Sequence, residues 1–145
     1  KNSLENTIKL MRLRGPDNAS YISRNYKDKQ LALLHSRLNI IDLNDRSNQP
    51  YEDENLTLIF NGEIYNFLEI KEKLKHKYKF RTESDTEVLL KAYKEYGEKC
   101  VDHFIGMWAF AIWDEKKKEL FLSRDPFGEK PLFYFANKNG FFFWI

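Results

Sequence analysis

A short polar stretch, NGEIYN at residues 61–66, follows the apolar run LTLIF. Asn-Gly between apolar residues is a strong signal for a tight hairpin turn. The same two residues could also direct one side-chain amide and one backbone N–H at an oxyanion that develops on a substrate carbonyl. Phe67, Ile70 and Leu74 follow at helical spacing, so a second hairpin strand does not fit before that helix. We predict a strand-to-helix corner with an exposed amide at Asn61, and a plain turn stays open as the alternative.

Three charged side chains could recognise a substrate near this corner. Arg37, in HSRLNIID, could grip a carboxylate through two hydrogen bonds. The sequence by itself favours the plainer interpretation, an arginine at a strand edge whose stem covers apolar surface. Asp85 opens a predicted helix, where the helix dipole alone explains a carboxylate, but it could also pair with a ligand ammonium. Glu63 is either a surface carboxylate or a second partner for the same ammonium.

Other kinds of site find no support in the sequence. His35, His76 and His103 are scattered, with no pair four residues apart and no neighbouring cysteine, so we expect no metal site. Neither of the two common glycine-rich phosphate-binding motifs is present. Cys100 precedes His103 by three residues, a spacing that would not bring the two side chains together well on a helix. We therefore expect a buried core cysteine.

Composition limits the class of protein. The 145 residues suit one domain with a proper core, and 42% hydrophobic content with 12 Phe and 8 Tyr indicates a globular fold. A net charge of +2, from 24 basic and 22 acidic residues, gives no reason to expect nucleic acid or a membrane as partner. The longest apolar stretch, GMWAFAIW, is far shorter than the roughly 20 residues of a spanning helix. One cysteine excludes an internal disulfide and suits a reducing, cytoplasmic compartment.

The pattern of apolar residues and caps predicts an α+β domain, with helices in the middle and antiparallel strands around them. Helices are expected at residues 1–14, from residue 67 behind an Asn66 cap with Glu69 as its acidic partner, from the capping box at 84–87 to Gly97, and near 98–104. Strands are expected at residues 31–42 and 56–60 and, as a meander of hairpins, at 107–114, 118–125, 130–137 and 140–145. Residues 18–30 are expected to form a loop, and residues 42–55 a turn-rich connection.

Seven segments in chain order carry a resemblance to a known family. LRGPD, HSRLNIIDL, QPY, FNGEIYNF, SDTEVLL, GMWAFAIWD and RDPFGEKPLFY resemble the glutaminase domain of glutamine-hydrolysing asparagine synthetases, which are class II glutamine amidotransferases. The resemblance covers essentially all 145 residues. It implies an N-terminal-nucleophile hydrolase fold, a four-layer sandwich with two antiparallel sheets between helix layers. The implied activity is hydrolysis of the glutamine side-chain amide to glutamate and ammonia.

The resemblance also implies partners for this domain. Ammonia would pass to a covalently linked synthetase domain, which uses ATP and Mg²⁺ to convert aspartate into asparagine. The glutaminase domain itself would need no cofactor and no metal. A homodimer is compatible with the resemblance. Two alternatives stay open: a related amidotransferase that delivers ammonia to another carboxylate, such as one on a surface-polysaccharide sugar, and a non-catalytic glutamine-binding or scaffold domain.

Substrate-binding roles follow from the resemblance residue by residue. Arg37 matches the arginine that clamps the α-carboxylate of glutamine. Asp85 and Glu63 match the groups that hold its α-ammonium. Backbone groups at Ile40 and Ile41 match positions that line the same pocket. Together these residues would recognise the two charges that every free α-amino acid carries.

Asn61 and Gly62 match the family's oxyanion hole. The resemblance implies that Asn61 donates through its side-chain amide and Gly62 through its backbone N–H. The family's nucleophile is a cysteine exposed at the N-terminus by loss of Met, with its own α-amino group as base. This sequence begins with Lys1, and Cys100 lies where the family has no catalytic residue. We therefore expect residues 1–145 to be a glutaminase domain truncated at both ends, with the nucleophile ahead of Lys1 and no activity in the chain as written. Leu13 stands where the family often has histidine.

Overall fold

The strands of this protein pair in antiparallel fashion throughout the part of the chain that the structure describes. The structure is a computed structural model that describes residues 2–11, 15, 17–37 and 47–145. One sheet has the strand order β3 (Tyr51–Asp53), β4 (Leu56–Ile64), β5 (Gly106–Asp114) and β6 (Glu119–Arg124). Two further ladders join β1 (Asn18–Tyr26) to β2 (Lys29–Arg37) and β7 (Phe133–Asn137) to β8 (Gly140–Trp144). The helices are α1 (Asn2–Met11), α2 (Phe67–Leu74), α3 (Asp85–Tyr96) and the 3₁₀ helix η2 (Gly97–His103).

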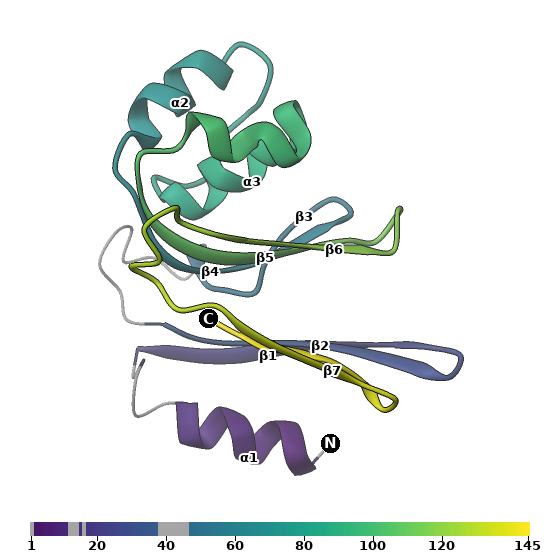
Figure 1. The fold of residues 1–145 in the computed structure, drawn as a ribbon. Coiled ribbons are helices and arrows are strands. Elements are labelled where there is room, and N and C mark those ends of the chain that lie inside the picture. The colour runs from purple at the N-terminus through teal and green to yellow at the C-terminus, as the bar shows by residue number, and fades with distance from the viewer. Residues whose placement is uncertain (1, 12–14, 16, 38–46) are drawn as a thin grey trace.

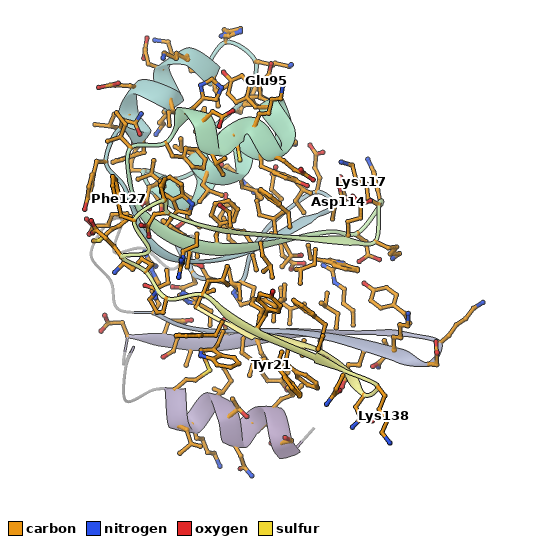
Figure 2. All side chains as sticks on the ribbon, viewed as in Figure 1. Tyr21, Glu95, Asp114, Lys117, Phe127 and Lys138 are labelled. Carbon is orange, nitrogen blue, oxygen red and sulfur yellow. The ribbon has the colours of Figure 1, made fainter. Side chains whose placement is uncertain are left out.

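The four-stranded sheet separates two apolar regions. Helices α2 and α3 lie on one side of it, while strands β1, β2 and β7 lie on the other, with α1 beyond them (Figure 1). Side chains fill the space between the two strand layers (Figure 2). Along β4, Leu58 and Phe60 face the core under the helices, whereas Ile59 packs with Leu33 of β2 in the second cluster. The predicted α+β class with antiparallel strands is therefore confirmed.

Asn61 and Gly62 lie inside β4, and the predicted corner at this dipeptide is wrong. Strand β4 continues to Ile64 and remains paired with β5 as far as Gly106, so the chain turns toward α2 only after Ile64. Gly62 has a φ of 150° and Gly106 a φ of 153°, a backbone region that side chains rarely adopt. The two glycines let the strands approach closely, and they do so without a turn at either residue.

A Cβ atom at Gly62 would lie 2.1 Å from the carbonyl oxygen of Met107 and 2.8 Å from the Cα of Trp108. We expect Gly62→Ala to lower the free energy of unfolding by about 3–4 kcal/mol, because it combines a strained φ with overlap against a neighbouring strand. Gly97→Ala is the matched control, since its φ is 61° but no atom lies within 4 Å of the added carbon. Urea unfolding followed by circular dichroism measures both variants, and equal losses would contradict the overlap with β5.

Three strand predictions need correction. The expected loop at 18–30 forms β1 and the start of β2, joined by a two-residue turn in which Lys27 has a φ of 44°. The expected connection at 42–55 contains the short strand β3. The expected meander breaks after β6, because β7 pairs with β8 alone. Asp125 ends β6 by accepting the N–H groups of Glu129 at 2.9 Å and Lys130 at 3.0 Å, which turns the chain away from the sheet.

The helices agree better with the sequence. Helices α2 and α3 and the short helix η2 lie where they were predicted, and Gly97 ends α3. The predicted cap of α2 is wrong, because the Asn66 side chain makes no cap hydrogen bond. It instead donates to the carbonyl of His103 and accepts the N–H of Ile105, both at 2.9 Å. Within the described ranges, no helix has the length and apolar character needed to cross a membrane.

Candidate active site

Strand β4 has an open edge where β3 ends. β3 pairs with β4 only at residues 56–58, and beyond them alternate N–H groups of β4 point away from β5. The Phe60 N–H donates to Gln49 Oε1 at 2.6 Å, and the Ile64 N–H donates to Asp85 Oδ2 at 3.1 Å. Side chains therefore take the place of a strand at both ends of this edge.

The Gly62 N–H lies between these two contacts. Gly62 is opposite Trp108 of β5, whose N–H and carbonyl both bond to Asp125 on the β6 side, at 3.3 and 2.8 Å. The Gly62–Trp108 pair is therefore a non-hydrogen-bonded pair of the antiparallel ladder, and the N–H of Gly62 points to the open edge. No acceptor among the described residues takes it up. A backbone donor without a partner at a strand edge is available to an oxyanion.

Asn61 and Glu63 project toward the β1–β2 layer. They alternate with the helix-facing residues of β4 and share the face of Ile59. Arg37 shares a face of β2 with Leu33, which packs against Ile59. Arg37, Asn61 and Glu63 therefore lie on the strand faces that look into the layer between β2 and β4.

Arg37 is buried, and the plainer expectation of a surface-edge arginine is wrong. It is 7% exposed, and its Nη1 donates to Asn48 Oδ1 at 2.9 Å. Its own carbonyl accepts the N–H of Asp17 at 3.2 Å, which fixes the end of β2. A buried, oriented guanidinium suits bidentate binding of a carboxylate. The other two residues predicted near it, Ile40 and Ile41, lie outside the described residues.

Asp85 reaches the open edge from the helix side. It is 4% exposed, and its Oδ1 accepts the Ser84 hydroxyl at 3.4 Å. Its Oδ2 accepts the backbone N–H of Ile64 at 3.1 Å. Burial raises the pKa of Asp85, hydrogen bonds from Ile64, Thr86 and Ser84 oppose this rise, and the charge of Glu63 adds to it. Neither carboxylate forms an ion pair with a described lysine or arginine. Two neighbouring carboxylates without a cation favour binding of a ligand ammonium.

His35 was considered in the sequence only as a metal ligand, and the structure places it beside the site. Its Nε2 lies 3.2 Å from the carbonyl oxygen of Phe60, which can only accept, so Nε2 carries the proton. Gln49 holds the N–H of the same residue, so both polar groups of the Phe60 backbone are fixed immediately before Asn61. The one available signal was the spacing of His35 and Arg37, two residues apart on one face of a strand.

Burial lowers the pKa of His35 from 6.5 to about 4. Because the unfolded chain binds this proton at higher pH than the folded protein does, stability is full above pH 6.5 and is lost as the pH falls toward 4. We expect the free energy of unfolding to fall by up to about 3 kcal/mol as this imidazole becomes protonated. Urea unfolding at a series of pH values should show a smaller loss in His35→Gln, with exposed His76→Gln as the control for removing a histidine. An unchanged profile in His35→Gln would contradict the buried, neutral imidazole.

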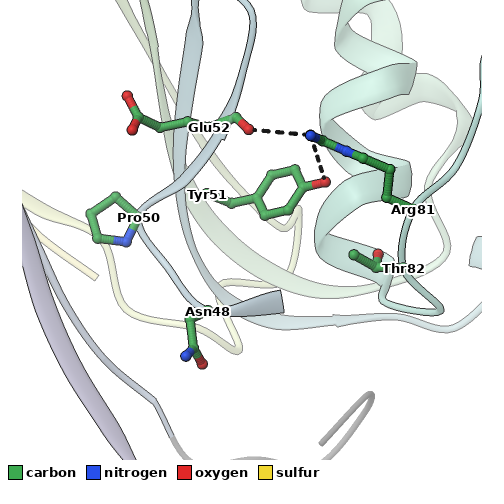
Figure 3. Close-up of a pocket in the computed structure, with 6 residues that line it drawn as sticks. All are labelled: Asn48, Pro50, Tyr51, Glu52, Arg81 and Thr82. Carbon is green, nitrogen blue, oxygen red and sulfur yellow. Dashed lines mark hydrogen bonds between the residues drawn. The ribbon is translucent and has the colours of Figure 1, made fainter. Parts of the chain in front are cut away.

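A hollow of about 360 Å³ borders the site without containing it. Its lining residues are Asn48, Pro50, Tyr51, Glu52, Arg81 and Thr82 (Figure 3). The Arg81 guanidinium points at the Tyr51 hydroxyl, 3.4 Å away, and at the Glu52 carbonyl, 3.5 Å away (Figure 3). None of the predicted site residues lines the hollow. The hollow is linked to them through Asn48, which lines it and accepts a hydrogen bond from Arg37.

Cys100 is a core cysteine, as predicted. It is 0% exposed, and burial raises the pKa of its thiol to about 12, so it carries no thiolate near neutral pH. Among the described residues no group of three or more His, Cys, Asp or Glu side chains could hold a metal ion.

Comparison with known proteins decides the family. Residues 1–144 match the sequence profile of the family described as glutamine amidotransferase domain. The chain belongs to the glutamine amidotransferase family. Within it, the chain is a class II glutamine amidotransferase domain, related to glutamine-hydrolysing asparagine synthetases.

Three relatives show how far the similarity extends. Over 159 residues the amidotransferase domain is 40% identical to a putative asparagine synthetase [glutamine-hydrolyzing] 2 of Methanocaldococcus jannaschii, covering 99% of this chain and 30% of the relative. It is 47% identical over 124 residues to asparagine synthetase [glutamine-hydrolyzing] 1 of Bacillus subtilis, covering 83% and 19%. It is 37% identical over 139 residues to amidase chry2 of Gibberella zeae, covering 94% and 20%. The chain therefore spans less than a third of the length of each of these relatives.

Proposed function

We propose that this amidotransferase domain binds free glutamine and hydrolyses its side-chain amide to glutamate and ammonia. The arrangement of charge around the open edge of β4 carries the proposal. A buried guanidinium, Arg37, faces the space between the strand layers, and a carboxylate pair without a cation, Asp85 and Glu63, lies at the edge. These charges complement the α-carboxylate and α-ammonium of one amino acid, and Asn61 and Gly62 lie in the same region of β4.

The chemistry that fits this arrangement is acyl transfer. In this family a cysteine at the N-terminus attacks the amide carbon, and the carbonyl oxygen becomes an oxyanion. The side-chain amide of Asn61 and the N–H of Gly62 would donate to that oxygen. Ammonia leaves as the tetrahedral intermediate collapses to a thioester, and water then releases glutamate and regenerates the thiol. Cys100 does not suit the part of this nucleophile, because it is buried and carries no thiolate near neutral pH.

The same proposal extends to the fold and to the fate of ammonia. The order of helices and strands in Figure 1 supports a four-layer sandwich of the N-terminal-nucleophile hydrolase type, with residues 1–145 forming part of the glutaminase domain. The names of the bacterial and archaeal relatives support delivery of ammonia to an asparagine-forming synthetase domain that uses ATP and Mg²⁺. The relative named amidase chry2 is not named as an asparagine synthetase, which favours a second candidate, in which ammonia goes to a carboxylate other than that of aspartate.

A glutamine analogue that carries an electrophile in place of the amide tests the proposed reaction. In the full-length protein we expect glutamate and ammonia in equal amounts from glutamine, and loss of both after labelling. Peptide mass spectrometry should locate the label on a cysteine at the mature N-terminus and leave Cys100 unmodified. A label on Cys100, or binding of glutamine with no turnover, would overturn the proposed mechanism.

A further inference from the structure

Glu87 is a fully buried carboxylate that accepts three groups of the loop before α3. It is 0% exposed, and it accepts the N–H of Arg81 at 2.9 Å, the N–H of Thr82 at 2.7 Å and the hydroxyl of Thr82 at 2.8 Å. The predicted capping box is therefore only half correct. Ser84 accepts the N–H of Thr86 as expected, but Glu87 turns to the loop and does not reach back to the N–H of Ser84.

Charge neutralisation does not explain this buried carboxylate. The nearest guanidinium nitrogen, Nε of Arg81, is 3.9 Å from Glu87 Oε1, and the Arg81 side chain is 62% exposed. An ion pair with an exposed partner at that distance contributes little. The negative charge of Glu87 is instead stabilised by two backbone N–H groups and one hydroxyl. These contacts fix the backbone conformation of residues 81–82.

These contacts continue to Asp85. The Thr82 hydroxyl, which donates to Glu87, also accepts the N–H of Ser84 at 3.3 Å. The Ser84 hydroxyl donates to Asp85 Oδ1 at 3.4 Å. Asp85 Oδ2 accepts the N–H of Ile64 at the open edge of β4. An unbroken series of hydrogen bonds therefore joins Glu87, through Thr82 and Ser84, to the candidate ammonium-binding carboxylate.

We propose that Glu87 is a positioning residue that fixes the orientation of the Asp85 carboxylate through Thr82 and Ser84. This inference rests on the proposed binding of the glutamine ammonium by Asp85. Without the Thr82 hydroxyl, the N–H of Ser84 loses its acceptor. The Ser84 hydroxyl still accepts the N–H of Thr86, but it is held less firmly against Asp85. The carboxylate then spends less time in the orientation that meets a ligand, so affinity falls although the fold remains.

Thr82 offers the sharpest pair of variants. Thr82→Val keeps the shape of the side chain and removes the hydroxyl, whereas Thr82→Ser keeps the hydroxyl and removes a methyl group. We expect Thr82→Val to raise the Kd for glutamine about tenfold, the effect of about one hydrogen bond to a charged group. Thr82→Ser should stay within about twofold of the wild-type Kd. Glu87→Gln should resemble Thr82→Val, since an amide NH₂ faces N–H groups that need an acceptor.

The titration of Asp85, read from its carboxyl ¹³C resonance, separates positioning from general damage. Loss of the Ser84 hydrogen bond should move the Asp85 pKa upward in Thr82→Val, and Thr82→Ser should restore it. The charged group that faces Asp85 from the neighbouring strand is Glu63, and both variants leave it in place.

Each outcome of the binding and titration experiments has a defined meaning. Wild-type Kd and wild-type Asp85 titration in folded Thr82→Val would overturn the inference and leave the proposed function intact. Equal losses in Thr82→Val and Thr82→Ser would also overturn it, because the hydroxyl would then have no special part. If the wild-type protein does not bind glutamine at all, the proposed function fails, and the inference that rests on it fails too.

Discussion

Asn61→Ala is expected to lower the turnover of glutamine in the full-length protein by about 10²–10³-fold, the usual effect of losing one oxyanion donor. The KM for glutamine should change by less than about threefold, since the side-chain amide would meet the oxyanion and not the charged groups of the substrate. Steady-state release of glutamate measures both constants. Within the described part of the chain, no group hydrogen-bonds to the Asn61 side chain, so the substitution removes a donor and leaves no new unpaired partner behind.

Asn66→Ala is the control for this experiment. The substitution removes two hydrogen bonds that hold the end of β4 to the segment before β5. Asn66 itself lies outside the candidate site. We expect lower thermal stability with unchanged turnover. If Asn61→Ala raised KM and left turnover unchanged, Asn61 would be a residue of the strand and the binding surface, and the oxyanion role would be wrong.

Arg37→Ala should raise the KM for glutamine by about 10²-fold, because truncation of one partner of a buried charge pair typically costs about 2–5 kcal/mol. Under the proposal that a linked synthetase domain uses the ammonia, synthesis driven by added ammonia should persist, since that reaction does not need the glutamine site. Arg37→Lys should recover only part of the affinity, because an ammonium cannot reproduce the two parallel hydrogen bonds of a guanidinium. Assays with glutamine and with ammonia as the nitrogen source separate the two effects.

Arg24→Ala provides the matched arginine control. Arg24 lies on β1 and pairs with Glu115 at 2.8 Å and with Glu52, away from the open edge of β4. Its removal should leave the KM for glutamine unchanged. Equal loss of glutamine-dependent and ammonia-dependent synthesis in Arg37→Ala would point to a general structural role and contradict the carboxylate clamp.

The sequence named the residues of the candidate site, whose roles stay predictions, but it did not predict their setting. Motif resemblance singled out Arg37, Asn61, Gly62, Glu63 and Asp85, and their strand and helix positions bring them to one edge of β4 and the adjoining layer. No sequence pattern indicated that this edge is open. That depends on how soon β3 ends and on the amide of Gln49, which replaces a strand partner through a contact between distant segments.

Two other sequence predictions, the loop at residues 18–30 and the Glu87 half of the capping box of α3, failed for local reasons. Strand β1 contains no fully buried residue, so the alternation of apolar and polar residues that reveals a half-buried strand is weak there. The turn after it uses Lys27 at positive φ, where glycine or asparagine would have marked a hairpin. At α3 the SDTE pattern correctly predicted the helix start. The Glu87 carboxylate, however, accepts N–H groups of the preceding loop and not the N–H of Ser84.

The measurement that tests the central claim most directly is a titration of the protein with L-glutamine, followed by amide NMR. The N–H of Gly62 has no acceptor among the described residues, so a bound substrate carbonyl should give it one. We predict a saturable shift of the Gly62 backbone amide and of the Asn61 side-chain amide with L-glutamine. N-acetyl-L-glutamine, which lacks the ammonium that Asp85 and Glu63 would hold, should produce neither shift. Saturable binding of L-glutamine that leaves Gly62 and Asn61 unshifted, or equal binding of the acetylated compound, would contradict a glutamine site at the open edge of β4.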